Sequence, residues 1–216
     1  MKMRIASRSL LALCLTLAAV PALAQGTVYD NGPVNGQVDA WTINFGFSVS
    51  DTFHIVGGTR INNISFWAWV EPGDVASSVE VQISSTGYFG NELFDGTVSL
   101  TQSNCFTNNF GFDVCAESGN YFGPALNPGN YYLTLSNATT LEGNPLYWDE
   151  NSGVGCLSNG CPSSAQENTL GTIPSEAFTL SYIETTTSGT TPEPGSIMLF
   201  GSGVLGLAGI LRRQLF

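Results

Sequence analysis

The chain has 216 residues, with 17 acidic residues, 6 Lys or Arg residues and a formal net charge of −11. Sixteen of the acidic residues but only one basic residue, Arg60, lie between residues 25 and 191, so this stretch carries a formal charge of −15. Such a charge excludes the basic surface that nucleic acid requires, and it disfavours direct adhesion to anionic lipid. The length of this stretch suffices for one domain with a hydrophobic core.

The first 24 residues have the three parts of a secretory signal peptide. A positive segment contains Lys2, Arg4 and Arg8. The apolar run 10–20 that follows has eleven residues and is too short to span a bilayer of about 30 Å. Small residues precede Gln25, so we predict that signal peptidase cleaves between Ala24 and Gln25. A retained N-terminal anchor is the alternative.

Residues 25–184 show short alternating apolar runs separated by Gly, Asn, Pro and Ser, which is typical of strands and turns. The run 78–84 alternates most clearly, and the run 64–70 is apolar on both faces, which predicts a central strand. Other predicted strands are 40–47, 93–100, 131–135, 146–149 and 178–182. We therefore predict an all-β body that forms a single antiparallel β-sandwich, jelly-roll-like.

Four cysteines fall in this body: Cys105, Cys115, Cys156 and Cys161. An even number in an exported chain favours disulfides, and we predict the pairs Cys105–Cys115 and Cys156–Cys161 because each brackets a short Gly/Asn-rich loop. A zinc site is the alternative. The spacing of Cys156 and Cys161 fits zinc marginally, whereas that of Cys105 and Cys115 does not.

Candidate catalytic residues are few. His54 is the only histidine, and no G-x-S-x-G pattern occurs in the body, so we expect His54 to be a surface or half-buried strand residue. A polysaccharide hydrolase needs a carboxylate pair, but Asp149 and Glu150 are adjacent, and on a strand their side chains point to opposite faces. We predict no enzyme, no catalytic residue and no cofactor.

Aromatic residues offer a carbohydrate-binding alternative, because the apolar face of a sugar ring stacks on an aromatic ring. The candidates are Trp41, Trp67, Trp69, Trp148, Tyr88, Tyr121 and Tyr147. We expect most of them to fill the core, with Trp148 and Asp149 as the possible glycan contact beside a loop. Calcium could bind the Asp- and Asn-containing segments 29–32 and 148–151, but neither matches a known calcium loop, and ordinary turn chemistry is the expectation.

The last 32 residues have a distinct composition. A polar Thr/Ser stretch, 185–191, predicts a flexible linker. The extended motif Pro192-Glu193-Pro194 follows, and then an uncharged apolar segment of fifteen residues, 197–211, which predicts a short transmembrane helix of about 22 Å. Arg212 and Arg213 then indicate a cytoplasmic stop, with the body outside the cytoplasm. A terminal core helix is the alternative.

This order of Pro192-Glu193-Pro194, apolar segment and arginine pair resembles the PEP-CTERM sorting tail of exported bacterial proteins, and the resemblance covers residues 192–216. It implies recognition by an exosortase-type membrane protease that cuts near the motif. The protein would be held in membrane lipid by its tail and then reach the cell envelope or the extracellular space.

Residues 128–151 also resemble a segment of many such proteins of unassigned activity, which supports the fold class alone. The resemblance implies a non-enzymatic role in the envelope or extracellular matrix, with extracellular polysaccharide as a possible partner.

Overall fold

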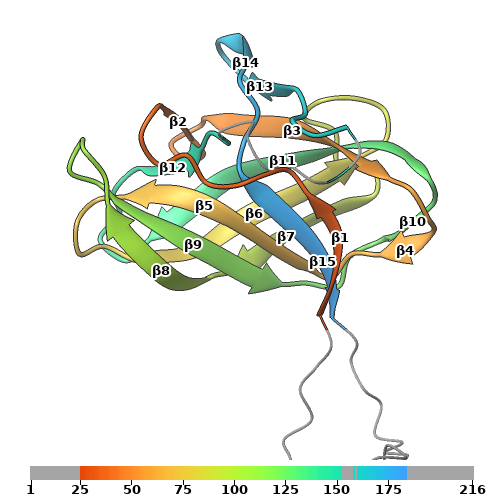
Figure 1. Ribbon diagram of the computed structural model, residues 1–216, viewed down its shortest axis with the longest axis horizontal. Coiled ribbons are helices and arrows are strands. Elements are labelled where there is room, and N and C mark those ends of the chain that lie inside the picture. The colour runs from red at the N-terminus through yellow and green to blue at the C-terminus, as the bar shows by residue number, and fades with distance from the viewer. Residues whose placement is uncertain (1–24, 152–157, 159, 184–216) are drawn as a thin grey trace, which may run out of the picture.

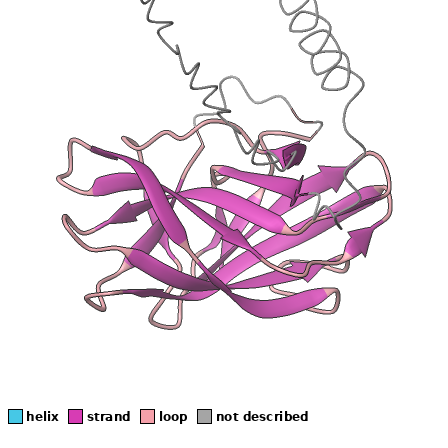
Figure 2. Cartoon of the chain, turned by 90° about the horizontal axis from the view of Figure 1, so that it is seen from below, coloured by secondary structure: helices cyan, strands magenta, loops and turns pink. Residues whose placement is uncertain are grey.

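The computed structural model describes residues 25–151, 158 and 160–183. The described part contains fifteen strands and no helix (Figures 1 and 2). No helix among these residues is long and apolar enough to cross a membrane, and the predicted signal helix and transmembrane segment 197–211 lie outside them. The all-β prediction for the body is confirmed.

Two antiparallel sheets pack against each other, and a two-stranded ribbon lies beside them. The first sheet contains β1 (Gln25–Asp30), β2 (Ala40–Thr42), β5 (Asn63–Val70), β8 (Thr101–Thr107), β9 (Asp113–Asn120), β12 (Leu146–Asp149) and β15 (Phe178–Ile183). The second sheet, in spatial order, contains β14 (Gly171–Ile173), β13 (Ala165–Glu167), β3 (Ser48–Ile55), β11 (Gly129–Thr140), β6 (Ala76–Ser84) and β7 (Phe94–Ser99). The ribbon pairs β4 (Thr59–Arg60) with β10 (Ala125–Leu126).

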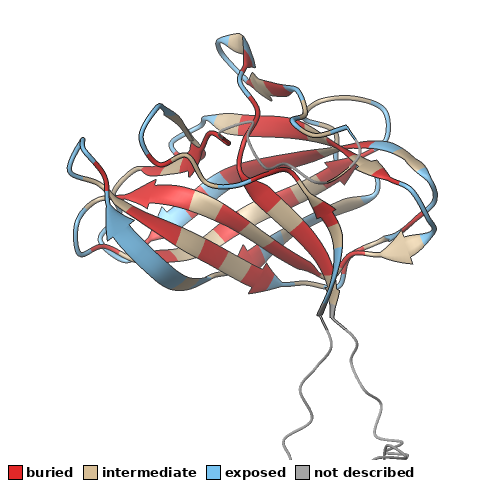
Figure 3. Cartoon of the chain, in the orientation of Figure 1, coloured by how far each residue is buried: buried red, intermediate tan, exposed pale blue. Residues whose placement is uncertain are grey.

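β5 is the central strand of the first sheet, as its apolar sequence predicts. β9 pairs along one side of it, while β15 and β12 share the other side, β15 along the first half and β12 along the second. The inward-facing side chains of β5 are fully buried: Ile64, Phe66, Ala68 and Val70. Its outward face carries Trp67 and Trp69. Figure 3 shows the alternation of buried and less buried positions along the strands.

The core between the sheets follows the alternation that the sequence shows. Val81 pairs with Leu135 and Ile83 pairs with Leu133 across β6 and β11, and all four side chains are fully buried. Apolar side chains from the two sheets form one continuous cluster. Burial of this apolar surface is the main favourable contribution to the stability of the body.

The two ends of the body lie side by side. β1 pairs antiparallel with β15 so that Gln25 is opposite Ile183, at one end of the first sheet (Figure 1). We call this the proximal end. β15 also pairs with β5 so that Ser181 is opposite Asn63, whereas Trp69 lies six residues farther along β5, about 20 Å away. We call that opposite end, where β5 finishes at Val70, the distal end.

The predicted strand 40–47 is only partly correct. Strand β2 ends at Thr42, and a turn with positive φ at Phe45 (56°) and Gly46 (89°) separates it from β3. The chain therefore changes sheets here, from β2 in the first sheet to β3 in the second.

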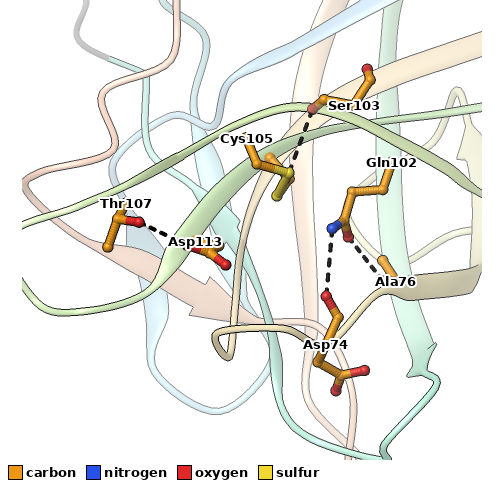
Figure 4. Close-up of a disulfide and its surroundings, with 8 residues drawn as sticks. Asp74, Ala76, Gln102, Ser103, Cys105, Thr107 and Asp113 are labelled. Carbon is orange, nitrogen blue, oxygen red and sulfur yellow. Dashed lines mark hydrogen bonds between the residues drawn. A yellow bond between two sulfur atoms is a disulfide. The ribbon is translucent and has the colours of Figure 1, made fainter.

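A disulfide joins Cys105 in β8 to Cys115 in β9, which confirms that predicted pair (Figure 4). The register of β8 against β9 shifts between Ser103 and Phe106, and Cys105 lies in that irregular segment. Cys161 is also disulfide-bonded, and its predicted partner Cys156 lies outside the described residues.

Candidate functional site

An aromatic surface covers the outward face of the first sheet near its distal end. Trp69 on β5 is opposite Tyr147 on β12, so both side chains project from the same face. The Trp69 ring stacks on Phe110 with centroids 5.5 Å apart, and Phe112 lies 5.7 Å from it. Phe112 in turn meets the Tyr147 ring edge-on at 5.6 Å.

The turn between β8 and β9 brings the two phenylalanines to this face. Gly111 separates them and has φ of +89°, a conformation that side chains rarely adopt. Phe110 is 60% exposed, whereas Phe112 is half-buried against Trp69 and Tyr147. The aromatic surface therefore includes the half-buried Phe112 ring and, beside it, the exposed Phe110 ring.

A pocket of about 210 Å³ opens on this surface, lined by Asp39, Ala40, Trp69, Phe112 and Tyr147. Asp39 precedes β2 and is exposed. Its backbone carbonyl accepts a hydrogen bond from the Glu150 N–H, and its Oδ1 accepts one from the Ala40 N–H. The pocket thus combines three aromatic walls with one carboxylate at its rim.

The buried Asp149 carboxylate fixes the position of Trp69, which lines the pocket. This carboxylate accepts hydrogen bonds from Trp69 Nε1, from the Asn35 backbone N–H at 2.8 Å and from the Gly36 backbone N–H at 2.9 Å. Burial raises the pKa of Asp149 to about 6, although these hydrogen bonds act in the opposite direction. Asp149 therefore fixes the Trp69 indole and the loop before β2 in one arrangement.

Gly36 permits that loop to lie close to the sheet. Its φ is +69°, and a Cβ there would lie 2.8 Å from the Phe106 ring. Phe106 also contacts Trp67, with ring centroids 6.1 Å apart. The loop and these rings cover the outward face of β5 beside the pocket.

The expected glycan contact at Trp148 and Asp149 does not fit this arrangement. Trp148 is fully buried, packs edge-on against Phe66 and Phe178, and donates its Nε1–H to the Ala177 carbonyl. Asp149 is also fully buried. Trp148 is opposite the inward-facing Ala68, so its indole points into the core, and Asp149 is covered by the loop whose Asn35 and Gly36 N–H groups it binds.

The other predicted aromatic residues are spread over the sandwich. Trp41 is half-buried against the core and donates to Glu150 Oε1 at 3.3 Å. Tyr88 contacts Tyr132 of the second sheet, and Tyr121 contacts Phe94. The structure brings Trp69 and Tyr147 together in the pocket, and it adds Phe112 and Asp39, which the sequence analysis did not single out.

Negative charge surrounds the pocket. Burial and then the charge of Glu71 raise the pKa of Tyr147, and burial and the charge of Asp39 raise the pKa of Glu150. Arg60 is the only basic residue in the described part of the chain, and it lies at the proximal end with its guanidinium 4.9 Å from the Phe122 ring. The pocket therefore offers nothing to neutralise an anionic ligand.

A second polar cluster lies in the interior, where the two segments considered for calcium meet. Asp51 faces inward from β3, and its carboxylate accepts hydrogen bonds from Asn31, Ser163, Ser175 and the Glu176 backbone N–H. The Asn151 side chain donates to the Asn31 carbonyl at 2.8 Å. These bonds satisfy the Asp51 carboxylate and tie four separate segments together.

Burial raises the pKa of Asp51 to about 6. Burial, and then the nearby charge of Asp51, raise the pKa of Glu176 well above its usual value. Within the described residues, no group of three or more His, Cys, Asp or Glu side chains is arranged to hold a metal ion. The arrangement is a buried hydrogen-bond network.

His54 lies on β3 as a half-buried strand residue, as predicted, with its Nδ1 2.7 Å from Asn130 Oδ1. The tail residues Pro192, Glu193, Pro194, Arg212 and Arg213 and the cleavage-site residue Ala24 lie outside the described residues, and Gln25 is the first residue of β1.

Comparison with known proteins concerns the tail. A search of curated proteins found no match to the chain. Residues 190–213 match the model of the PEP-CTERM protein-sorting motif. That motif implies export, association with the membrane or cell surface, and processing by exosortase. The chain therefore carries a PEP-CTERM sorting tail, as its C-terminal sequence predicts.

Proposed function

We propose that this protein is a non-enzymatic component of the cell envelope or extracellular matrix, delivered there after an exosortase-type protease cleaves its tail. The observation that carries the proposal is the match of residues 190–213 to the sorting motif. Two further features support a structural body: the carboxylates of Asp51 and Asp149 are fully buried in hydrogen-bond networks, and a disulfide joins β8 to β9. The spatial order β1-β15-β5-β9 against β3-β11-β6-β7 supports a jelly-roll-like sandwich.

The pairing of the two ends suits a body tethered at one point. Because Gln25 and Ile183 are opposite each other, the signal segment and the tail are both attached to the body at the proximal end. A tail of 33 residues, 184–216, follows the last strand, so the distal end would point away from the membrane. Removal of the tail would leave all fifteen described strands intact.

Substitution within the motif tests the sorting proposal. Glu193→Ala should slow conversion of the precursor to the mature form in cells that contain the sorting protease, measured by pulse–chase and gel mobility. Glu184→Ala, an acidic residue outside the motif, is the matched control and should be processed at the wild-type rate. Equal processing of both variants would contradict recognition through the motif.

Carbohydrate binding by the body is a second candidate function. The observation that favours it is the aromatic pocket of Trp69, Phe112 and Tyr147 at the distal end, where a tethered body would meet extracellular polymer. A polysaccharide hydrolase is less well supported. Asp39 is the one carboxylate among the residues that line the pocket, whereas glycoside hydrolysis ordinarily requires two facing carboxyl groups.

A further inference from the structure

The pocket has the shape and surface that suit a single sugar ring. Phe112 and Tyr147 meet edge-on at 5.6 Å, and both rings line the pocket together with Trp69. The C–H faces of a pyranose are apolar and pack against aromatic faces. A volume of about 210 Å³ is small, so the pocket would take one ring and leave the rest of a chain outside.

Two polar groups in the pocket can orient such a ring. Asp39 is exposed, and its Oδ1 accepts one hydrogen bond, from the Ala40 N–H. Because a carboxylate has about four acceptor sites, it can also accept hydrogen bonds from ligand hydroxyl groups. The Tyr147 hydroxyl can both donate and accept a hydrogen bond. A largely aromatic pocket with a few polar groups that fix orientation is the usual composition of a small-molecule site.

The negative charge around the pocket favours neutral sugars over anionic ones. Asp39 at the rim and Glu71 beside Tyr147 are both acidic, and Arg60 lies on a strand at the other end of the body. The uronate or phosphate groups of an anionic polysaccharide would be repelled, because like charges at close range are unfavourable. A neutral sugar carries no such penalty.

The surroundings of the pocket extend its apolar surface along the face of the sheet. Phe110 is 60% exposed and stacks on Trp69, and Phe106, which contacts Trp67, is 39% exposed. Neighbouring rings of a polymer could contact this surface while one ring occupies the pocket. Trp69 in the pocket also lies about 20 Å along β5 from Asn63, which is near the proximal end.

We propose that the pocket formed by Asp39, Trp69, Phe112 and Tyr147 is a binding subsite for one ring of a neutral extracellular polysaccharide. This proposal rests on the carbohydrate-binding candidate above and assigns to it the site and the class of ligand. It is independent of the sorting tail, since every residue that lines the pocket belongs to the body.

Calorimetric titration of the purified full-length protein with soluble oligosaccharides tests the proposal. The panel contains neutral gluco-, manno-, galacto- and N-acetylglucosamine oligomers, with oligogalacturonate as the anionic member. At least one neutral oligomer should bind, and oligogalacturonate should bind at least tenfold more weakly. Failure of every neutral oligomer to bind, or tighter binding of the anionic member, would overturn the proposal.

Variants locate the binding. Asp39→Ala and Phe112→Ala should each weaken binding of the neutral oligomer by about tenfold or more. Phe122→Ala is the matched control, because Phe122 is an aromatic residue with 84% exposure that stacks with Arg60 outside the pocket. Asp39 is exposed and its side chain takes part in no core packing, so Asp39→Ala should fold even if Phe112→Ala does not. Wild-type affinity in folded Asp39→Ala would contradict the assignment. Normal tail processing alongside absent binding would overturn the glycan site and leave the sorting function standing.

Discussion

Glu117 provides a sharp physical test of the fold, because its side chain points into the core. It lies opposite Phe66 in the pairing of β9 with β5, so it shares the inward face of the sheet, and it is fully buried. Neither of its carboxyl oxygens has a hydrogen-bond partner. Burial therefore raises its pKa from 4.5 to about 8. The folded protein keeps this carboxyl protonated at neutral pH, whereas the unfolded chain does not.

The sign and size of the effect on stability follow from this difference. Since the folded pKa is raised, the stabilising contribution is complete below about pH 4.5 and is lost as the pH rises to about 8. Each pH unit within that window costs about 1.4 kcal/mol, so about 2–3 kcal/mol should be lost between pH 5.5 and 7.5. Glu117→Gln removes the titration. The stability of the variant relative to wild type should therefore increase by that amount over the same two pH units.

Urea unfolding monitored by tryptophan fluorescence at pH 5.5, 6.5 and 7.5 measures this difference. Asp51 and Asp149 also titrate with raised pKa values, but they are present in both proteins and cancel in the comparison. Glu142→Gln changes an exposed carboxyl and serves as the control for the loss of one carboxyl group. A constant difference between Glu117→Gln and wild type across these pH values would refute the assignment of Glu117 to the core.

Two further substitutions test the pocket support and the disulfide. Asp149→Ala removes the acceptor for Trp69 and for the backbone N–H groups of Asn35 and Gly36, so it should lower the free energy of unfolding by about 2–4 kcal/mol, and an unchanged urea midpoint would contradict this. Replacing Cys105 and Cys115 by serine opens a short loop with a sequence separation of 10, which should cost about 2–3 kcal/mol. A melting temperature equal to that of the oxidised wild type would contradict this predicted loss of stability.

Strands with regular alternation could be predicted from the sequence, whereas strands with acidic residues on the inward face could not. Val79, Val81 and Ile83 mark β6 because every inward position is apolar. In β3 and β9 the inward faces include Asp51 and Glu117, which break the alternation although both side chains are fully buried. Hydrogen bonds from distant segments offset the cost of burying Asp51, and protonation offsets the cost of burying Glu117. Neither effect can be read from the local sequence.

The candidate site was predictable only in part for a similar reason. Trp69 and Tyr147 stand out as aromatic residues, but their proximity depends on the pairing of β5 with β12. Phe112 has one local signal, the Phe-Gly-Phe turn at 110–112, which indicates exposed aromatic residues around a tight turn. Trp148 was expected near the surface because a loop follows it, but that expectation failed because Trp148 is opposite the inward-facing Ala68 on β5, so its indole lies in the core.

The intact mass of the mature protein tests the central claim most directly. It should be measured on protein isolated from matched cells with and without the exosortase-type protease. Processing through the motif predicts a chain that begins at Gln25 and ends near Pro192–Pro194 when the protease is present, and a longer chain that retains Phe216 when it is absent. A C-terminus at Phe216 in both samples would contradict sorting by cleavage.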